Sequence, residues 1–452
     1  MIAYIENLKK VPYRYCRIAG FILLCASVIP KHAHSTDLPY ISLQSALLFS
    51  LHESTKIKIA GEKEEQALHS VDEAKAKYYP DIQFLVEAGR EYNNPATSDD
   101  AVTSGEKSNA NNSVDINLTL RQMLFDRTKT SEVLRVQQLK HSKNIESSII
   151  EQDVIMDTLK AYINVLDGQK NASAAAEMLV SIKGFADKIG VAYKAGSESK
   201  AKYDYVSARL ALAGSKYNIA VSSYQNSMSS LEALTGRLPE FLAIEPDELS
   251  VQDYDLSVYK HLATKKNSEL ELIESNIHAT KIDYDKQRAT YLPKINLVLE
   301  AGQSFDKGGK VGRVREASTM VQFQYDVFKG FGRRAAKKRI SSKLRELEYE
   351  KEDLIKDIIK KVKVNYNEIE AIKGTIFSKE KEVDSYLSLR QISQQSSKEG
   401  EVDLFQSIEN EEQLYDALSQ IYKFQSNAYI KSYKLLKLIG SLKSKKFCES
   451  CN

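Results

Sequence analysis

Four segments of the chain alternate between apolar and polar residues, at about 80–91, 114–125, 293–304 and 318–328. A period of two predicts β-strands of about ten residues, each with one apolar and one polar face. This length and pattern are typical of tilted strands that cross an outer membrane with lipid outside and water inside. A half-buried sheet in a soluble protein would show the same alternation, so the pattern alone leaves that alternative open.

Two further features favour the membrane alternative. The segments between the paired strands, 93–112 and 306–316, are polar and rich in Gly, Asn and Ser, as is typical of exposed hairpin loops. Aromatic residues gather near the predicted strand ends, where they could form interfacial belts in a chain without Trp. These residues are Tyr78, Tyr79, Tyr92, Phe125, Tyr291, Phe305, Phe328 and Phe331.

The segments that follow each strand pair have a heptad-like apolar rhythm. Ile149, Met156 and Ile163 are seven residues apart, and the same spacing continues elsewhere in both halves. Such stripes predict long helices with coiled-coil packing over 129–196 and 332–400. At roughly 1.5 Å per residue, a helix of about 68 residues reaches on the order of 100 Å. A globular core does not need this reach, whereas a hollow periplasmic tube does.

The sequence contains an internal repeat, with one copy in each half of the chain. Residues 76–82 align with 289–295, and Glu87-Ala88-Gly89 recurs as Glu300-Ala301-Gly302 at the same offset of 213. Later matches have offsets of 203 or 204, because the first half carries the longer loop between its strands. This self-similarity predicts a tandem duplication.

Each half is therefore expected to run from a helix through two strands into a long helical hairpin. We expect repeat 1 over 36–237 with its hairpin turn near Gly196, and repeat 2 over 256–440 with its turn near Gly400. Residues 238–255 would form a linker and 441–452 a C-terminal tail.

The first 35 residues have the pattern of a secretory signal. Basic residues precede an apolar run at 18–29, and Ala33-His34-Ser35 places small residues where a signal peptidase reads them. We expect cleavage after Ser35. An uncleaved membrane anchor is the alternative, but an apolar run of about 12 residues is too short to span a bilayer.

Composition narrows the function classes. The chain has 452 residues, 28% of them charged, and a formal net charge of +3. Balanced charge argues against nucleic acid as a partner, which would favour a concentrated basic face. No run of 18 apolar residues occurs, so the sequence is not typical of a helical membrane protein.

Four strands also place a condition on assembly. They cannot close a barrel, because closed barrels begin at about eight strands. An open sheet edge in hydrocarbon leaves backbone groups without hydrogen bonds, at a cost of several kcal/mol each. At least two copies of the chain must therefore combine, and this argument does not fix their number.

These features together resemble the outer-membrane efflux protein family of the TolC type, over essentially the whole mature chain. The motifs that carry the resemblance are Tyr79-Pro80 and Leu292-Pro293 before strands, Leu124-Phe125-Asp126 and Val327-Phe328 after strands, Gly196 and Gly400 at helix turns, and the helical run that includes Ala208-Arg209-Leu210 and ends at Leu234-Thr235-Gly236.

The resemblance implies a mainly α fold with a membrane β-barrel portion. Four transmembrane strands per protomer and a long α-helical coiled-coil barrel would assemble as a homotrimer in the outer membrane of a Gram-negative bacterium. Such proteins are exit ducts for drugs or proteins in tripartite efflux pumps and type I secretion systems. Partners would be a periplasmic adaptor protein, an inner-membrane ABC or proton-driven transporter, and outer-membrane lipid. The alternative is a periplasmic coiled-coil adaptor or scaffold without a pore, which would not need the strand pairs.

The resemblance also places the helix turns at the periplasmic tip, where the tunnel closes and the adaptor binds. The family often has an acid six residues after each turn glycine, but Lys202 and Gln406 occupy these positions here. Glu409 matches a further acidic position of the second repeat, with Asp403 close by. We expect Glu409 and Asp403 to form an acidic constriction, although a solvated charged helix face is the simpler alternative. The docking turns would include Gly196, Gly400, Glu198 and Glu401.

The sequence lacks the motifs of a catalytic or metal site that would indicate an enzyme. The mature histidines have no metal-ligand spacing, and Gly308-Gly309-Lys310 lacks the spacing of a phosphate-binding loop. Cys448 and Cys451 lie near the C-terminus, where we expect a local disulfide or a tail without function. The sequence thus predicts a non-enzyme with no cofactor and no metal.

Overall fold

The computed structural model is mainly helical, with strands gathered between the helices of each half. The expected signal segment, most of the expected linker and most of the C-terminal tail lie outside the described residues. So do Gly400, Glu401 and Asp403. The described ranges are 40–93, 109–237, 241–242, 255–307, 312–399 and 404–442.

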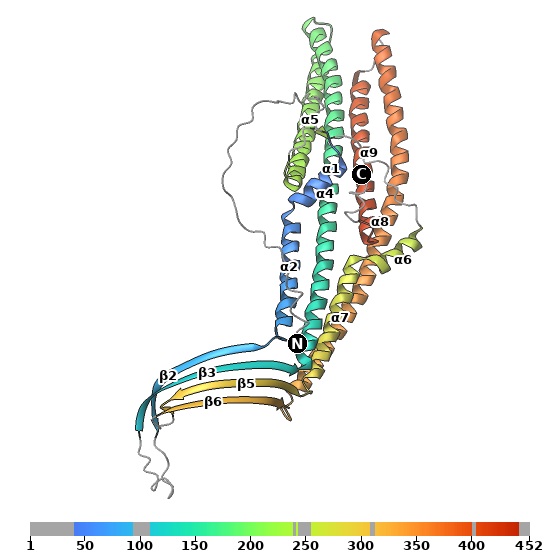
Figure 1. Ribbon diagram of the computed structural model, residues 1–452. Coiled ribbons are helices and arrows are strands. Elements are labelled where there is room, and N and C mark those ends of the chain that lie inside the picture. Colours follow the sequence, from blue (N-terminus) through green and yellow to red (C-terminus); the bar gives the residue numbers. More distant parts are fainter. Residues whose placement is uncertain are drawn as a thin grey trace, which may run out of the picture. The chain divides into compact units, whose positions relative to one another are not determined.

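The elements follow the same order in the two halves of the chain (Figure 1). A pair of shorter helices leads into two strands, and a long helical hairpin follows. The helices are α1 (Leu43–Glu53), α2 (Thr55–Ala76), α4 (Arg127–Lys194), α5 (Lys200–Thr235), α6 (Leu256–Lys266), α7 (Ser268–Ala289), α8 (Gly332–Glu399) and α9 (Leu404–Leu438). The strands are β1 (Tyr40–Ile41), β2 (Asp81–Asn93), β3 (Asn109–Phe125), β4 (Phe241–Leu242), β5 (Lys294–Phe305) and β6 (Arg313–Gln324).

The long helices α4 and α8 each have 68 residues. Asp126 starts α4, because its Oδ1 accepts a hydrogen bond from the Thr128 amide at 2.9 Å and so satisfies one free N–H of the first turn. Gly196 follows α4 with φ +76°, in the left-handed region that glycine adopts without strain. None of the described helices is both long and apolar enough to cross a bilayer.

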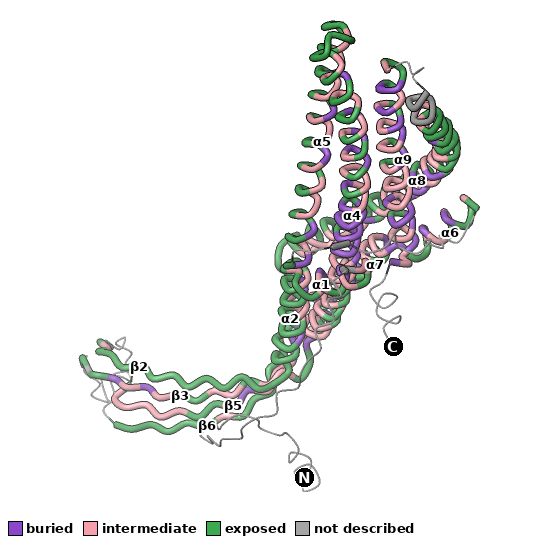
Figure 2. The backbone as a smooth tube through the Cα atoms, turned by 90° about the horizontal axis from the view of Figure 1, so that it is seen from above, coloured by how far each residue is buried: buried purple, intermediate pink, exposed green. Residues whose placement is uncertain are grey.

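The two helical hairpins, α4 with α5 and α8 with α9, lie side by side (Figure 1). Contacts between α4 and α9 join them, and α4 also packs against α2 and α7. Figure 2 shows that the buried residues lie mainly on these helices, whereas the strands are largely exposed. The helical part therefore holds the hydrophobic core.

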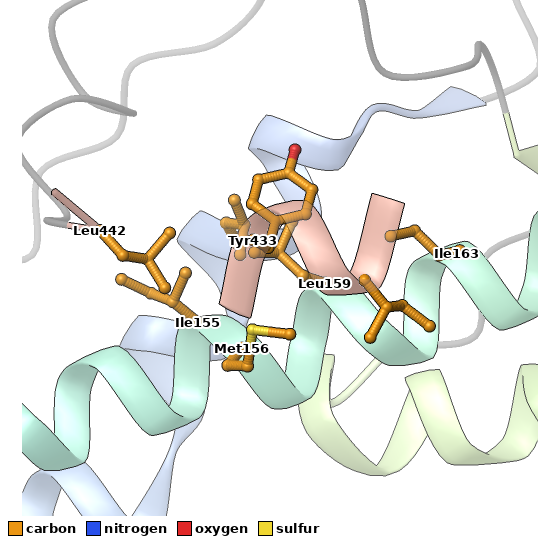
Figure 3. Close-up of a cluster of buried hydrophobic side chains, with 8 residues drawn as sticks. Ile155, Met156, Leu159, Ile163, Tyr433 and Leu442 are labelled. Atoms are coloured by element: carbon orange, nitrogen blue, oxygen red, sulfur yellow. The ribbon is translucent and has the colours of Figure 1, made fainter. Parts of the chain in front are cut away.

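One core cluster joins α1, α4 and α9 (Figure 3). Ile155, Leu159 and Ile163 on α4 are buried against Tyr433 of α9 and Leu47 of α1. Their four-residue spacing puts them on one face of α4. The apolar rhythm in the sequence thus corresponds to buried contacts between helices.

The four long strands form one antiparallel sheet in the order β2-β3-β5-β6. The register pairs Phe84 with Leu118, Leu118 with Ala301 and Ala301 with Ala317, so one row crosses all four strands. The short strands β1 and β4 pair separately, in parallel.

Two strands differ in extent from the sequence expectation. β3 begins at Asn109 rather than near 114, because its pairing with β2 continues to Asn93. β6 covers Arg313–Gln324 rather than 318–328, so it begins and ends earlier. It ends before Asp326, whose Oδ2 lies 3.0 Å from Arg333 Nη2.

Candidate functional site

One face of the sheet is apolar and uncovered. The register places the even-numbered residues of β2 and β3 and the odd-numbered residues of β5 and β6 on this face. Phe84 is 67% exposed and Phe323 is 65% exposed. Large contiguous apolar surfaces of this kind mark sites that contact another protein or a membrane. The apolar face comprises chiefly Ile82, Phe84, Val86, Ala88, Val114, Ile116, Leu118, Leu120, Ile295, Leu297, Leu299, Ala301, Val321 and Phe323.

The opposite face of the sheet is polar. One row of this face contains Gln83, Thr119, Glu300 and Ser318. Nearer the strand tips, Asp115 is buried and its Oδ2 lies 2.9 Å from Lys307 Nζ. The sheet therefore separates an apolar from a polar surface, as the alternation in the sequence predicts.

The sheet has two unpaired edges, because β2 and β6 each pair on one side only in the described chain. The outward backbone N–H and C=O groups of these strands lack partners within the sheet. Such edges invite pairing with another strand. One chain thus presents an incomplete sheet.

Exposed aromatic residues surround the end of the sheet next to the helices. Phe328 and Phe331 are 73% and 76% exposed, and their rings meet edge to face with centroids 6.0 Å apart. The Arg333 guanidinium lies over the Tyr291 ring at 5.3 Å from its centroid. These rings have an apolar body beside charged groups, which suits a membrane–water interface.

At the first helix turn, the structure brings two of the predicted site residues together. Lys202 Nζ lies 3.0 Å from Glu198 Oε2, and the side chain of Ser199 caps α5 by accepting a hydrogen bond from the Lys202 amide. Lys202 therefore does not present a free positive charge, because Glu198 neutralises it. Gly196 makes this tight turn possible.

At the second helix turn, the described residues include Gln406 and Glu409 on the first turns of α9. Both side chains are exposed. Their predicted neighbours Gly400, Glu401 and Asp403 lie outside the described residues.

No pattern in the sequence indicates the buried ion pair that lies near this turn. Glu411 is 5% exposed, and its Oε1 lies 2.9 Å from Arg390 Nε. Burial raises the pKa of the Glu411 carboxyl, although the Arg390 charge acts in the opposite direction. Arg390 also lies 3.7 Å from Glu177 of α4. This arginine thus links α8 to both α9 and α4.

Two further ion pairs join the hairpins through α5 and α9. Arg209 Nη1 lies 2.9 Å from Glu412 Oε2, and Lys216 Nζ lies 2.8 Å from Asp416 Oδ1. The sequence indicates only that these residues lie on helices, and it does not indicate that they contact one another. The partners are about 200 residues apart, and only tertiary structure brings them together.

Comparisons with known proteins agree with this fold. Residues 261–441 match the family model of the outer membrane efflux protein. The chain is 23% identical over 171 residues to the alkaline protease secretion protein AprF of Pseudomonas aeruginosa. That alignment covers 37% of this chain and 35% of the relative, so it spans about a third of that protein.

Solved outer-membrane channels share the fold over nearly the whole chain. The Campylobacter jejuni CmeC outer membrane channel superposes with a TM-score of 0.76 at 14% identity, over 90% of this chain and 88% of that one. The open-state MtrE outer membrane channel of Neisseria gonorrhoeae gives 0.71 at 15% identity, over 89% and 90%. An efflux-protein family is a transport family rather than an enzyme family. Residues 261–441 thus match the outer membrane efflux protein family, and the chain as a whole has the fold of solved outer-membrane channels.

Proposed function

We propose that this chain is one subunit of an outer-membrane channel-tunnel that exports molecules from the periplasmic side to the exterior. The observation that carries the proposal is the incomplete sheet, which has an uncovered apolar face, a polar face and two unpaired edges. It is joined directly to helices of 68 residues, which supply the wall of a long tube.

The membrane portion would form by joining sheets from several copies. The β2 edge of one copy would pair with the β6 edge of the next, which satisfies the backbone groups that hydrocarbon leaves without partners. Three copies of the four-stranded sheet would supply twelve strands. The apolar faces would then contact outer-membrane lipid, and the polar faces would line a water-filled passage.

The length of the strands is sufficient to cross a membrane. β5 and β6 have 12 residues each. At about 3.3 Å per residue such a strand reaches about 40 Å, and tilted by about 45° it crosses a hydrocarbon layer of about 28 Å. The exposed aromatic residues Phe328 and Phe331 would then lie at the interface on the helical side.

The helical tube would extend into the periplasm and meet its partners at the helix turns. A periplasmic adaptor would dock around Gly196 and Gly400, with Glu198 and Glu401 at the contact. An inner-membrane ABC or proton-driven transporter would supply the energy, because the duct itself is passive. The relative AprF is a protein of alkaline protease secretion, which supports type I secretion, and CmeC is an outer membrane channel, which fits drug efflux equally well.

The closed end of the tube would be controlled at the second helix turn. Glu409 with Asp403 would form an acidic constriction that favours cations, with Gln406 one turn away on the same helix. Lys202 would contribute little charge there, because Glu198 holds it at 3.0 Å.

Fractionation of the expressed chain tests the proposal. We expect it in the outer membrane as an oligomer that survives unheated gel electrophoresis and dissociates on heating, and that conducts ions in planar bilayers. A soluble periplasmic species without conductance would overturn the proposal and favour an adaptor or scaffold instead.

A further inference from the structure

A cavity of about 480 Å³ lies where α9 ends and α7 begins, between the long helices α4 and α8. This volume is within the range of small-molecule sites. Ile149, Val364 and Leu438 contribute apolar surface to its wall. The polar part of the wall is dominated by five lysines, Lys360, Lys361, Lys431, Lys434 and Lys437.

Three of these lysines form ion pairs with acidic residues. Each of the three makes an ion pair that neutralises its charge and fixes its ammonium group at the edge of the cavity. The pairs are Lys361 with Asp357, Lys431 with Glu368, and Lys437 with Asp153.

The remaining two lysines, Lys360 on α8 and Lys434 on α9, have no acidic partner among the described residues. Partial burial lowers the pKa of the Lys434 ammonium and the nearby charges of Lys431 and Lys160 lower it further, whereas the charge of Glu368 acts in the opposite direction. The described part of the cavity wall therefore carries an ammonium group without an ion-pair partner on each of two helices, α8 and α9. An anion between α8 and α9 would relieve this repulsion.

The acids of the cavity wall do not cancel that charge. Only Asp357 and Glu269 are acidic among its lining residues. Asp357 Oδ2 lies 2.7 Å from Lys361 Nζ, and Glu269 also acts on the charge of Lys361. Glu269 lies in the first turn of α7, where a carboxylate is stabilised by the helix dipole. Asp357 therefore has Lys361 as its nearest partner and acts on Lys360 only through its charge, and neither acid makes an ion pair with Lys360 or Lys434 in the described part of the chain.

We propose that this cavity is a binding site for a small anionic ligand that carries phosphate or carboxylate groups. Lys360 from α8 and Lys434 from α9 bind the anionic groups, and the apolar wall accommodates the rest of the ligand. The site goes beyond the proposed export function and does not depend on it, since it lies within one chain.

Calorimetric titration of the purified full-length protein in detergent with inorganic pyrophosphate tests the site. We expect saturable binding, because a polyvalent anion can contact both lysines. The double variant Lys360→Gln/Lys434→Gln should bind about tenfold more weakly or worse, since it loses two charge-assisted contacts. Both lysines are exposed enough for glutamine to leave the fold intact, which circular dichroism checks.

The matched control is Lys363→Gln, which removes an exposed lysine of α8 outside the cavity wall. Its affinity for pyrophosphate should equal that of the unmodified protein. Absence of saturable binding, or an equal loss in the control, would overturn the proposal. A protein that conducts ions but does not bind pyrophosphate would contradict this site alone, so the two proposals are tested separately.

Discussion

Asn267 joins the end of α9 to the start of α7 through a hydrogen bond from its Nδ2 to the Leu438 carbonyl oxygen, at 3.0 Å. Its Oδ1 accepts hydrogen bonds from the amides of Glu269 and Leu270, at 2.9 and 3.2 Å. One buried side chain thus satisfies free groups of two helix ends. This contact stacks α7 on α9 in the space between α4 and α8.

Replacement of Asn267 should destabilise this junction. We expect Asn267→Ala to lower the free energy of unfolding by about 1–3 kcal/mol, because it removes a helix cap and leaves the Leu438 carbonyl without its partner. Chemical denaturation followed by circular dichroism measures the change. Ser54 precedes α2 at the corresponding junction of the first half but makes no side-chain cap bond. Ser54→Ala is therefore the control, and a loss of equal size there would contradict the assignment.

Glu132 of α4 binds Arg135 of the same helix, with Oε1 2.7 Å from Arg135 Nη2, and links α4 to α7 through its Oε2, 2.6 Å from Lys286 Nζ. The hydrogen bond from Arg135 is the main reason that the Glu132 pKa falls from 4.5 to about 2, and Lys286 lowers it further. Since the folded-state pKa lies below the unfolded value, the carboxylate stabilises the fold above about pH 4.5, and this stabilisation is lost as the pH falls toward about 2.

We therefore expect Glu132→Gln to lower the free energy of unfolding at pH 7 by about 1–3 kcal/mol and to flatten its dependence on pH between about 4.5 and 2. Denaturation curves at a series of pH values provide the measurement. The control is Glu146→Gln, because Glu146 makes only a partly exposed pair with Lys143 on the same helix. An unchanged pH profile of the Glu132 variant would refute the role of this carboxylate.

Adjacent residues of β2 test which face of the sheet contacts lipid. Phe84 lies on the apolar face and Gln83 on the polar face, in the same part of the strand. We expect Phe84→Arg to reduce strongly the amount of oligomer in the outer membrane, since arginine facing hydrocarbon costs about 2–4 kcal/mol per copy near the midplane. Gln83→Arg should assemble normally. Quantification of the unheated oligomer in membrane fractions compares them, and equal assembly of both variants would exclude the assigned orientation.

Glu409 tests the proposed constriction. Single-channel recordings under a salt gradient should show a lower preference for cations in Glu409→Gln, because one carboxylate per copy is removed from the proposed constriction. Glu409→Asp keeps the charge and should keep the preference. If the reversal potential is the same for Glu409→Gln as for the unmodified channel, Glu409 belongs to a solvated helix face.

The sequence was sufficient where a period is repeated along one element. The two-residue period assigned Ile82, Phe84 and Val86 to one face of a strand, and the register with β3 places them together. The heptad-like spacing of Ile149, Met156 and Ile163 predicted a long helix, which the structure contains as α4. Local pattern is enough in these cases, because side-chain direction follows from backbone geometry alone.

The sequence was insufficient where partners come from distant segments. Asn109 and its neighbours read as loop residues because they do not alternate, yet pairing with β2 extends the strand through them. The approach of Arg390 to Glu411 depends on how α8 and α9 pack, which the spacing of charges does not reveal. The lysines of the cavity likewise come from two helices, so only the fold brings Lys360 and Lys434 to one space.

The central claim is that sheets from several copies join edge to edge into one closed wall. Native mass spectrometry of the protein extracted from outer membranes tests it most directly. We expect a detergent-dependent complex of three chains, in which β2 and β6 have no free edge. A stable single chain that remains soluble without detergent would contradict the account.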